Sequence, residues 1–527
     1  MNVAPSLIVP RPADRLERLL APLDRLFNRV YGARYNPIYQ TGPLTVGLFL
    51  VMTVTGLYQL YFYKIGAPYE SVTTMQEQVW SGRWIRALHR YAADLAVTAA
   101  VLHALRMFLQ GKTWGPRALA WITGQILMGL LLFIGWTGYV LVWDRQGQVI
   151  AMEGARLLDV LPVFSEPLRR SFITEEIVNS GFFFLNLFLH IALPLALLLF
   201  LWIHTVRLAR PKISPPRPLL WGVIGALLVL SILWPAALPP KGDALSMLGK
   251  VEVDWFFSFW VPVARAVSPP VHLALWGALA LVLFSVPLWW RHRPEVKAQP
   301  STLEERFCTG CTQCYKDCPY EAIAMVPRTQ GFGSEVVAQV SPELCVSCGI
   351  CAGSCAPMQI GPAGRRGQEQ LDLIEAFVAA HRPRADTVVV FTCRNGVGED
   401  PRLAAGGGVL VYPALSCAGA LHTSVLEYVL RKGAGGAYVL SCPERDCVFR
   451  EGPKWLQERV YSDREAELKD RVDKRRVRIG LFQHSDLPAA LADLAEFRRF
   501  VAGLAQAEAE ERVDLDQACE ALEVSHG

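Results

Sequence analysis

Long apolar stretches fill the first 290 residues of the chain, whereas shorter alternating ones fill the rest. Six of the long stretches could each cross a bilayer as a helix, because about 20 apolar residues are enough. They lie near residues 43–63, 88–109, 118–142, 182–206, 219–238 and 271–290. Residues 13–31 place leucine and arginine at helical spacing, which predicts an amphipathic helix on a membrane surface, although an ordinary surface helix has the same pattern.

The charged residues between these spans predict their orientation. The connector after the fourth span carries Arg207, Arg210, Lys212 and Arg217 and no acidic residue, whereas the connector after the third is long and mixed in charge. By the positive-inside rule, the N-terminus, the short connector and everything after Trp290 lie in the cytoplasm. We therefore expect a multi-pass protein of the cytoplasmic (inner) membrane of a prokaryote.

Two spans carry histidines at one repeated interval. His89 and His103 lie fourteen residues apart in the second span, and His190 and His204 repeat that interval in the fourth. Fourteen residues make nearly four helical turns, so both imidazoles of a pair point to almost the same side, about 21 Å apart along the axis. A lone histidine in an apolar helix is usually structural, but two equal pairs in membrane spans favour bis-histidine binding of two stacked haems.

Glycines repeat the same interval in two other spans. Gly42 and Gly56 lie fourteen residues apart around the first span, and Gly124 and Gly138 do so in the third. Because glycine lets a large flat group approach the backbone closely, we expect these residues to face the two haem planes. Glycine is also common in membrane helices for packing reasons, so the pattern supports the histidine argument without replacing it.

All thirteen cysteines follow Phe307, and most of them form two runs with the same spacing. Cys308–Pro319 and Cys345–Pro357 each contain the pattern C-x2-C-x2-C-x3-C, the spacing of two-cluster 4Fe–4S ferredoxins, in which the fourth cysteine of a run serves the other cluster. The predicted sets are Cys308, Cys311, Cys314 and Cys355 for one cluster, and Cys318, Cys345, Cys348 and Cys351 for the other. Clustered cysteines of this kind indicate metal in a reducing compartment, with a zinc site as the weaker alternative.

The region after these runs has the pattern of an α/β domain. Four β-rich runs, VVVFTC, GVLVYPALSC, AYVLSC and VRIGLF, alternate with helical stretches. Cys393, Cys417 and Cys442 fall at or just past the ends of these runs, and Cys447 follows in a CPERDC turn. Parallel strands end at one edge of a sheet, where ligands usually bind. Four thiolates at that edge could hold a 2Fe–2S cluster, and buried cysteines without a ligand are the alternative.

These patterns divide the chain into domains. The net charge of +4 is too small to indicate nucleic acid as a partner. We expect an all-α transmembrane di-haem four-helix bundle plus two further spans, then a small α+β ferredoxin domain and an α/β iron–sulfur domain. The boundaries are 1–217 for the di-haem domain with its N-terminal amphipathic helix, 218–292 for two further spans and their loop, 293–306 for a linker, 307–360 for the ferredoxin domain, 381–510 for the two-iron domain and 511–527 for an acidic tail.

The first 290 residues resemble cytochrome b of the quinol-oxidising respiratory and photosynthetic complexes. The resemblance is carried by RALHR, LHALRMFLQGK, PRALAWITG, GWTGYVLVWD and the TGLY motif of the first span. It implies two haem b groups, held by His89 with His190 on the outer side and by His103 with His204 near the cytoplasm. Arg86 and Arg106 match positions that pair with haem propionates in that family.

The loop after the fifth span resembles the outer quinol-site signature of the same family. Val253–Arg265 reads VDWFFSFWVPVAR, where Pro-Glu-Trp-Tyr is usual, so Asp254 stands at the glutamate position and a valine replaces the proline. The resemblance implies that Asp254 and Trp255 lie at a quinol site, and the shorter carboxylate could accept a quinol proton through a water. The alternative is that Asp254 sits at the membrane surface among aromatic belt residues.

The remaining regions resemble two families of iron–sulfur protein. Residues 308–357 look like a bacterial two-cluster ferredoxin, and the region from Asp386 to Leu504 resembles the delta subunit of methyl-viologen-reducing hydrogenase through SCPERDCVFREG, VYPALSCAGAL and KRRVRIGLF. The second resemblance implies a 2Fe–2S cluster and electron exchange with the flavin subunit of heterodisulfide reductase-type complexes. That family usually has more than one thiol near the first cysteine, whereas only Cys393 is present here.

Together these features predict electron transport across the membrane. We expect a quinone-dependent oxidoreductase subunit that links the membrane quinone pool through two b haems to iron–sulfur clusters and a cytoplasmic flavoprotein, heterodisulfide reductase-like or hydrogenase-like. It would work within a multi-subunit complex, for which a dimer is one expected form. The alternative is a haem-containing membrane anchor that relays electrons between protein partners and has no quinone site.

Overall fold

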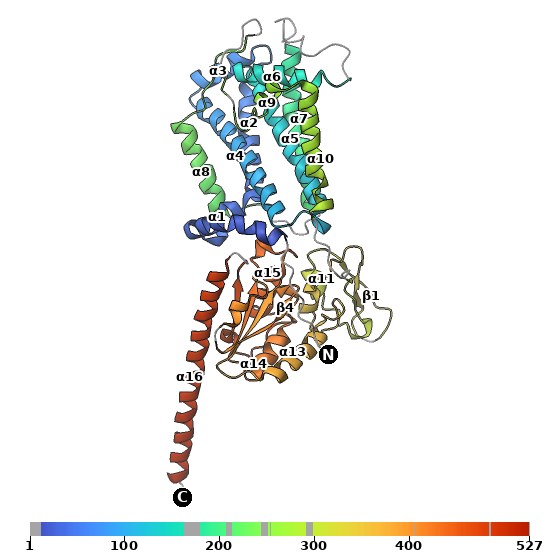
Figure 1. Ribbon diagram of the computed structural model, residues 1–527, viewed down its shortest axis with the longest axis vertical. Coiled ribbons are helices and arrows are strands. Elements are labelled where there is room, and N and C mark those ends of the chain that lie inside the picture. Colours follow the sequence, from blue (N-terminus) through green and yellow to red (C-terminus); the bar gives the residue numbers. More distant parts are fainter. Residues whose placement is uncertain are drawn as a thin grey trace. The chain divides into compact units, whose positions relative to one another are not determined.

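The computed structural model describes residues 12–162, 180–206, 213–243, 251–252, 254–290, 299–331, 333–405, 407–483 and 486–525. These residues form two compact units, one built mainly from the first 292 residues and the other mainly from residues 293–527 (Figure 1). The first unit is helical, and the second combines strands with helices.

Among the residues described, the first unit has five helices that are long and apolar enough to cross a membrane. They are α2 (Thr41–Phe62), α4 (Gly82–Leu109), α5 (Ala118–Val142), α7 (Ser180–Val206) and α10 (Pro269–Trp289). Five of the six spans predicted from the apolar pattern are thereby confirmed as apolar helices of spanning length.

The predicted fifth span is shorter than its apolar stretch. Helix α8 runs from Arg217 to Leu233 and has 17 residues, at the lower limit for crossing a bilayer. The helix stops there because Trp234 precedes Pro235, and a residue before proline disfavours helical backbone. Trp234 accordingly has φ −130° and ψ 71°. The expectation of a helical span that reaches residue 238 is therefore wrong.

Shorter or amphipathic helices accompany the apolar ones. They are α1 (Pro12–Tyr35), α3 (Pro68–Gln78), α6 (Arg145–Leu158) and α9 (Val261–Ala266). Helix α1 covers the segment predicted to be an amphipathic helix, and it lies crosswise to α2 and α4 in Figure 1. Gly32, with φ 70° and ψ 157°, interrupts its helical backbone near the C-terminal end.

The core of the first unit forms where α2 packs on α4 and α5 packs on α7. Leu48 of α2, Ala92 and Ala96 of α4, Leu131 of α5 and Leu197 of α7 are buried in one apolar cluster. The two alanines keep the surface of α4 flat, which lets the neighbouring helices approach closely. This packing brings the helices that carry histidine against the helices that carry the repeated glycines.

The second unit begins with a small part that holds both ferredoxin-like cysteine runs. Strands β1 (Ile323–Pro327) and β2 (Val336–Val340) pair antiparallel, and the short helices α11 (Gln313–Asp317) and α12 (Ile350–Gly353) flank them. The antiparallel pair and its two helices agree with the α+β character expected for this region.

The rest of the second unit is a parallel sheet covered by helices on both faces. Its strands lie in the order β4-β3-β5-β6. They are β3 (Val388–Cys393), β4 (Val409–Leu415), β5 (Gly436–Ser441) and β6 (Val477–Leu481), which correspond to the four predicted β-rich runs. The helices are α13 (Gly367–His381), α14 (Thr423–Arg431), α15 (Gly452–Tyr461) and α16 (Leu487–Ser525).

Alternate residues of the central strands enter two separate apolar clusters. Val389 and Val439 belong to the cluster that includes residues of α13, α14 and α15, whereas Val390 and Tyr438 pack with Leu494 of α16. Both central strands are buried along their whole length, as expected for a parallel sheet covered on two sides. The predicted acidic tail is not a separate segment, because α16 continues through it as far as Ser525.

Candidate metal centres

Four threonine–glycine dipeptides on α2 and α5 lie against the four histidines of α4 and α7. They occupy positions 41–42, 55–56, 123–124 and 137–138. A Cβ at the glycine would lie 3.0 Å from Cε1 of His103 for Gly42, 3.2 Å from His89 for Gly56, 3.4 Å from His204 for Gly124 and 2.9 Å from His190 for Gly138. A larger residue at position 42, 56 or 138 would crowd the imidazole, whereas an added Cβ at Gly124 would be in ordinary van der Waals contact with it.

The threonines of three dipeptides hold the histidines by one ring nitrogen. The distances from Nδ1 to the threonine Oγ1 are 2.9 Å for His89 and Thr55, 3.0 Å for His190 and Thr137, and 3.1 Å for His204 and Thr123. Each threonine hydroxyl is also within donating distance of a backbone carbonyl of its own helix. With its proton used there, the oxygen accepts from Nδ1–H, which leaves the Nε2 lone pair of the imidazole free to bind a metal.

A second acceptor supports the same tautomer. The Nδ1 atom of His190 also lies 3.0 Å from the carbonyl of Ile134, three residues before Thr137. His89 and His204 make backbone hydrogen bonds with Met52 and Ala120, which hold the same position relative to Thr55 and Thr123. A second acceptor fixes the orientation of the ring as well as its protonation. A ligand histidine that is held in this way needs little reorganisation to bind iron.

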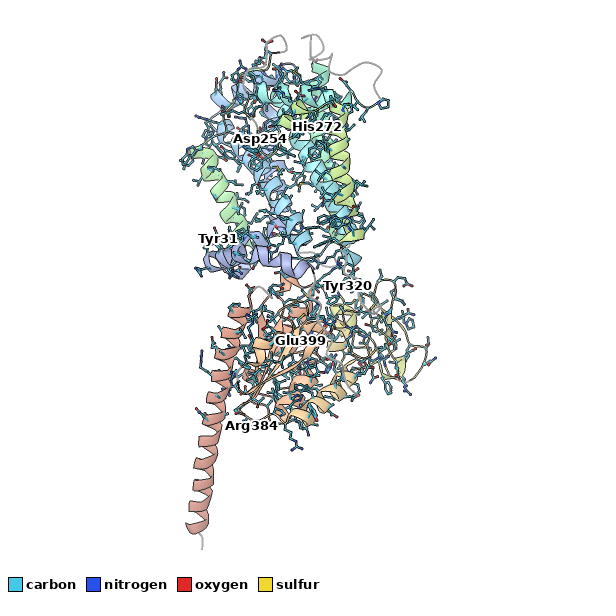
Figure 2. The ribbon with its side chains drawn as sticks, viewed as in Figure 1. Tyr31, Asp254, His272, Tyr320, Arg384 and Glu399 are labelled. Carbon is cyan, nitrogen blue, oxygen red and sulfur yellow. The ribbon has the colours of Figure 1, made fainter. Side chains whose placement is uncertain are left out.

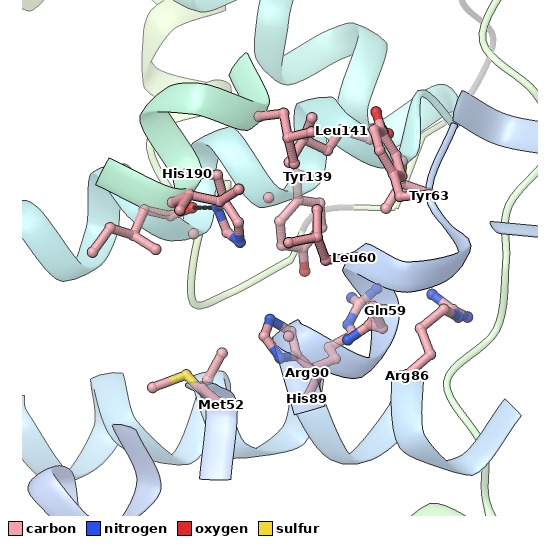
Figure 3. Close-up of a pocket in the computed structure, with 18 of the residues that line it drawn as sticks. Met52, Gln59, Leu60, Tyr63, Arg86, His89, Arg90, Tyr139, Leu141 and His190 are labelled. Carbon is pink, nitrogen blue, oxygen red and sulfur yellow. Dashed lines mark hydrogen bonds between the residues drawn. The ribbon is translucent and has the colours of Figure 1, made fainter. Parts of the chain in front are cut away.

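The imidazoles of His89 and His190 face each other at the end of the bundle that is expected to face outward, which we call the outer end. Their ring centroids are 6.5 Å apart. A metal with nitrogen–metal bonds of about 2 Å on each side would separate two opposed imidazoles by roughly this distance. A cavity of about 310 Å³ surrounds the two rings, within the usual size range of small-molecule sites (Figure 3).

The lining of this cavity is apolar with a few basic groups. Met52, Gly56, Leu131, Gly138 and Leu187 line it together with both histidines, and Arg86 and Arg90 also reach it. Arg86 donates through Nε to Gln76 at 2.7 Å and through Nη2 to the carbonyls of Ala236 and Ala237. Its guanidinium is thus fixed at the edge of the cavity, where it could pair with an acidic substituent of a bound group. These residues fit a flat group that carries carboxylates and takes two axial imidazoles.

The inner level of the bundle contains His103, His204 and Arg106. The Arg106 guanidinium makes a two-pronged ion pair with Asp24 of α1, at 2.9 and 3.2 Å, and it stacks over the ring of Tyr39. The side chains of Arg106 and Asp24 are 5% and 8% exposed. This pair fastens α1 to α4 beside the inner histidines, a contact that the sequence did not indicate.

Asp254 is held by four hydrogen bonds on the outer side. Its Oδ1 accepts from the backbone N–H groups of Phe256 and Phe257, at 2.8 and 2.7 Å. Its Oδ2 accepts from the Tyr139 hydroxyl at 2.7 Å and from Arg90 at 3.1 Å. Because Tyr139 and Arg90 line the outer cavity, Asp254 is connected to that cavity without lining it.

The two neighbouring candidates behave differently. Trp255, which was predicted to lie at a quinol site, is 81% exposed and does not line the outer cavity. Phe257, two residues later, is buried and does line it. Arg90, one helical turn before Asp94, makes its ion pair with Asp254. One oxygen of Asp94 is buried without a hydrogen-bond partner.

The first ferredoxin-like set of cysteines surrounds a small cavity. Cys308, Cys311 and Cys314 of the first run line it together with Cys355 of the second run, the combination expected from the spacing. Leu303, Met325, Ala338 and Ile360 are among the other residues that line it, together with Thr309, Thr312 and Pro357. Four sulfurs in a mostly apolar shell are a donor set that fits a 4Fe–4S cluster.

The second set lies around backbone and hydroxyl donors. Ser301 donates through its N–H to Cys345 Sγ at 3.3 Å, its hydroxyl lies 3.4 Å from Cys351 Sγ, and the N–H of Ala322 donates to Cys318 Sγ at 3.3 Å. Hydrogen bonds to the ligand sulfurs are one of the means by which proteins tune the potential of iron–sulfur clusters. Cys348, the fourth member of the set, is buried.

The two cysteine runs share one backbone shape. The residue before the second cysteine has positive φ in both runs, 71° at Gly310 and 57° at Ser347, and so does the residue after it, 64° at Thr312 and 81° at Gly349. Left-handed backbone at a serine or threonine costs roughly 1–2 kcal/mol. Two loops that keep the same strained path around their cysteines are built for the same task.

Burial also determines the chemistry of the free thiols. It raises the pKa of Cys351 to about 12, and it raises the pKa of Cys318 and Cys355 above the ordinary value. Thiols in such surroundings keep their protons unless a metal replaces them, and thiolate is the form that binds metal. Within the described parts of the chain, no group of three histidine, cysteine or acidic side chains has the geometry to hold a single ion.

Four cysteines of the α/β domain meet at the carboxyl edge of the parallel sheet. Cys393, Cys417, Cys442 and Cys447 are each 1% exposed, and their free thiols lie within hydrogen-bonding reach of one another in the order Cys393, Cys442, Cys447, Cys417. A Cβ at Gly452 would lie 2.7 Å from the Cys417 sulfur, so this glycine leaves room for it. Four mutually adjacent buried sulfurs fit a two-iron cluster.

Sequence reasoning missed several residues of these sites. The threonine that precedes each repeated glycine is visible in the sequence, and the fourfold Thr-Gly repeat could have been found there. Gly452 belongs to the SCPERDCVFREG motif, although its contact with a cysteine appears only in the fold. The contact of Tyr139 with Asp254 joins residues far apart in the chain and left no local signal.

Three parts of the chain match models of known families. Residues 28–211 match the family model described as cytochrome b/b6/petB, residues 307–357 match a 4Fe-4S dicluster domain, and residues 388–505 match the delta subunit of methyl-viologen-reducing hydrogenase. A solved structure titled "Hyperthermophilic respiratory Complex III" is similar at a TM-score of 0.39 and 19% identity, over 51% of this chain and 82% of that chain. So low a similarity supports no inference. The three family matches show that the chain joins a cytochrome b-type segment, a 4Fe–4S dicluster segment and a hydrogenase delta-subunit-like segment in one multi-pass electron-transfer protein.

Proposed function

We propose that the chain is the quinone-dependent subunit of a respiratory oxidoreductase. It would link the membrane quinone pool through two b haems to two 4Fe–4S clusters, one 2Fe–2S cluster and a cytoplasmic flavoprotein. The observation that carries this proposal is the opposed pair His89 and His190, with both Nδ1 atoms anchored and both rings bordering one cavity. The bound haem and iron–sulfur groups would supply one-electron transfer, which no side chain of this protein offers.

A quinol would bind beside the haem of the outer cavity, where Arg90 and Tyr139 would orient it. Arg90 and Tyr139 line the cavity, and each donates a hydrogen bond to the Asp254 carboxylate. A quinol hydroxyl that displaced the Tyr139 hydroxyl could donate its proton to Asp254 Oδ2. Asp94 is a second candidate for this proton, because one of its oxygens is buried without a partner in a membrane span.

The alternative function also has an observation in its favour. Both oxygens of Asp254 are already occupied by two donors each, so the carboxylate serves a structural role in the absence of quinol. In a relay without a quinone site, this cluster would only lock the loop to α4 and α5. The membrane segment would then connect protein partners on its two sides.

Electron exchange with the cytoplasm is proposed for the second unit. Two observations support a flavoprotein partner of the heterodisulfide reductase-like or hydrogenase-like type. They are the match to the delta-subunit family and the four adjacent, buried cysteine sulfurs at the sheet edge. We place the N-terminus and the iron–sulfur domains in the cytoplasm of a prokaryote. The chain would be part of a multi-subunit complex, for which a dimer is one proposed form. The charge of the connectors supports this orientation.

Quinol-dependent haem reduction in the purified protein tests the proposal. Asp254→Asn is expected to slow it by at least about 100-fold, the usual contribution of a positioned acid or base. Glu252→Gln is the matched control, because this exposed residue lies on the same loop. If neither ubiquinol nor menaquinol reduced the wild-type haems, the quinone function would be refuted. If Asp254→Asn matched the control while Asp94→Asn was slow, Asp94 would be the proton acceptor; if both matched the control, the relay would be favoured.

A further inference from the structure

The second ferredoxin-like site and the four-cysteine site share one buried cluster. Cys348 of the former and Cys417 of the latter pack with Ile350, Ala420 and Trp455. Among the residues that the structure describes, none beyond Ile360 lines the cavity of the first ferredoxin-like set. The packing therefore distinguishes between two cysteine sets that the sequence treats as equivalent.

Glycines and a buried arginine keep the two loops close. A Cβ at Gly349, next to Cys348, would lie 3.0 Å from the Cβ of Ala420. Arg459 of α15 is 1% exposed and donates to the carbonyl of Ile350 at 3.3 Å, to Ser354 at 2.8 Å and to the carbonyl of Gly419 at 2.5 Å. One guanidinium thus ties the loop of the second ferredoxin-like set to the loop that follows Cys417.

Arg365 also connects the same two loops by hydrogen bonds. Its Nη1 donates to the hydroxyl of Ser416 at 2.6 Å, and its Nη2 donates to the carbonyl of Ser347 at 3.1 Å. Each of these serines is the chain neighbour of a cysteine, Cys417 and Cys348 respectively. The cation consequently lies between two sites that would each hold negatively charged iron and sulfur.

The first ferredoxin-like set has a different type of contact with the α/β domain. The carbonyl of Cys355 accepts a hydrogen bond from His422 Nε2 at 3.1 Å. His422 begins α14 and is none of the four cysteines, so this contact brings no second sulfur site against the first set. The shared sulfur packing is limited to the Cys348 side.

We propose that the site of Cys318, Cys345, Cys348 and Cys351 is the electron partner of the site of Cys393, Cys417, Cys442 and Cys447, and that Arg365 positions and tunes both. The proposal rests on the proposed function, because it requires clusters at both sites. One electron would leave the cluster at one site and reduce the cluster at the other, with no bond formed or broken. A fixed cation favours the more negative, reduced state of a cluster, so Arg365 should raise the potentials of both sites.

Titration of the intact, cluster-loaded protein, followed by electron paramagnetic resonance, tests this assignment. The signals are assigned beforehand with Cys311→Ser for the first ferredoxin-like site and Cys447→Ser for the four-cysteine site. In Arg365→Gln the midpoint potentials of the two flanking clusters should fall together, while the potential of the first ferredoxin-like cluster stays unchanged. Arg365→Lys keeps the charge and should return both potentials close to those of the wild type.

Arg384→Gln is the matched control, because Arg384 is an exposed arginine of the same unit that pairs only with Asp386 in the described contacts (Figure 2). It should leave all three potentials unchanged. Equal shifts of all three clusters in Arg365→Gln, a shift of the first ferredoxin-like cluster alone, or no shift at all would overturn the assignment. A wild-type protein that lacks iron and sulfide would instead refute the proposed function itself.

Discussion

The hydroxyl of Thr55 is the most informative atom to remove from the haem-binding region. Thr55→Val keeps the size and shape of the side chain but deletes the oxygen that lies 2.9 Å from His89 Nδ1. The ring would retain the carbonyl of Met52 as its second acceptor. Loss of one hydrogen bond of this kind costs about 1 kcal/mol, and outer partners of metal ligands change affinity by about 10–100-fold.

We therefore expect Thr55→Val to weaken outer haem binding by about tenfold, since a second acceptor remains. A weaker bond at Nδ1 also makes the imidazole a poorer electron donor, so the midpoint potential of the outer haem should rise. The inner haem should be unaffected, because His103 and His204 do not contact Thr55. Haem content and spectroelectrochemical titration in detergent measure both effects.

Thr45→Val provides the control on the same helix. The Thr45 hydroxyl donates to a carbonyl four residues earlier, as the Thr55 hydroxyl does, but it touches no histidine. Equal behaviour of the two variants would refute the argument that Thr55 fixes the ligand. A shift of the inner haem instead of the outer one would refute the assignment of levels.

Three further changes test other parts of the structure. Gly138→Ala should displace His190 and remove the outer haem signal. Gly222→Ala is its control: the added Cβ would lie in open space, so both haem spectra should stay unchanged. Gly452→Ala should crowd a ligand sulfur and abolish the 2Fe–2S resonance while both 4Fe–4S resonances persist. Asp24→Asn should lower the free energy of unfolding by about 3–5 kcal/mol, because it removes the carboxylate charge that pairs with the buried Arg106. Glu70→Gln breaks an exposed ion pair and should change thermal unfolding by no more than about 1 kcal/mol.

The periodic features of the chain could be predicted because they follow from backbone geometry. A fourteen-residue interval must return to the same side of a helix, so the pairing of His89 with His103 required only the helical repeat. The cysteine spacing likewise determined which sulfurs could meet, and Cys355 does line the cavity of the first run. The β-rich runs were recognisable because strands buried on both faces need continuous apolar residues.

Contacts between distant segments could not be predicted. The ion pair of Asp24 with Arg106 joins residues 82 positions apart, and the pair of Arg90 with Asp254 joins residues 164 positions apart. Arg90 had a closer carboxylate in sequence, Asp94, yet the loop supplied a better placed one. Pro235 indicated in the sequence that α8 would end early, but the apolar residues on both sides of it led to the prediction of a longer span.

The number of b haems retained by histidine variants tests the central claim most directly. Dithionite-reduced minus oxidised spectra of the purified wild type should show two b-type haems per chain. His190→Leu should lose the outer haem and His204→Leu the inner one, each leaving the other in place. Wild-type protein without b-type absorbance, or a variant at either histidine that keeps both haems, would contradict the claim.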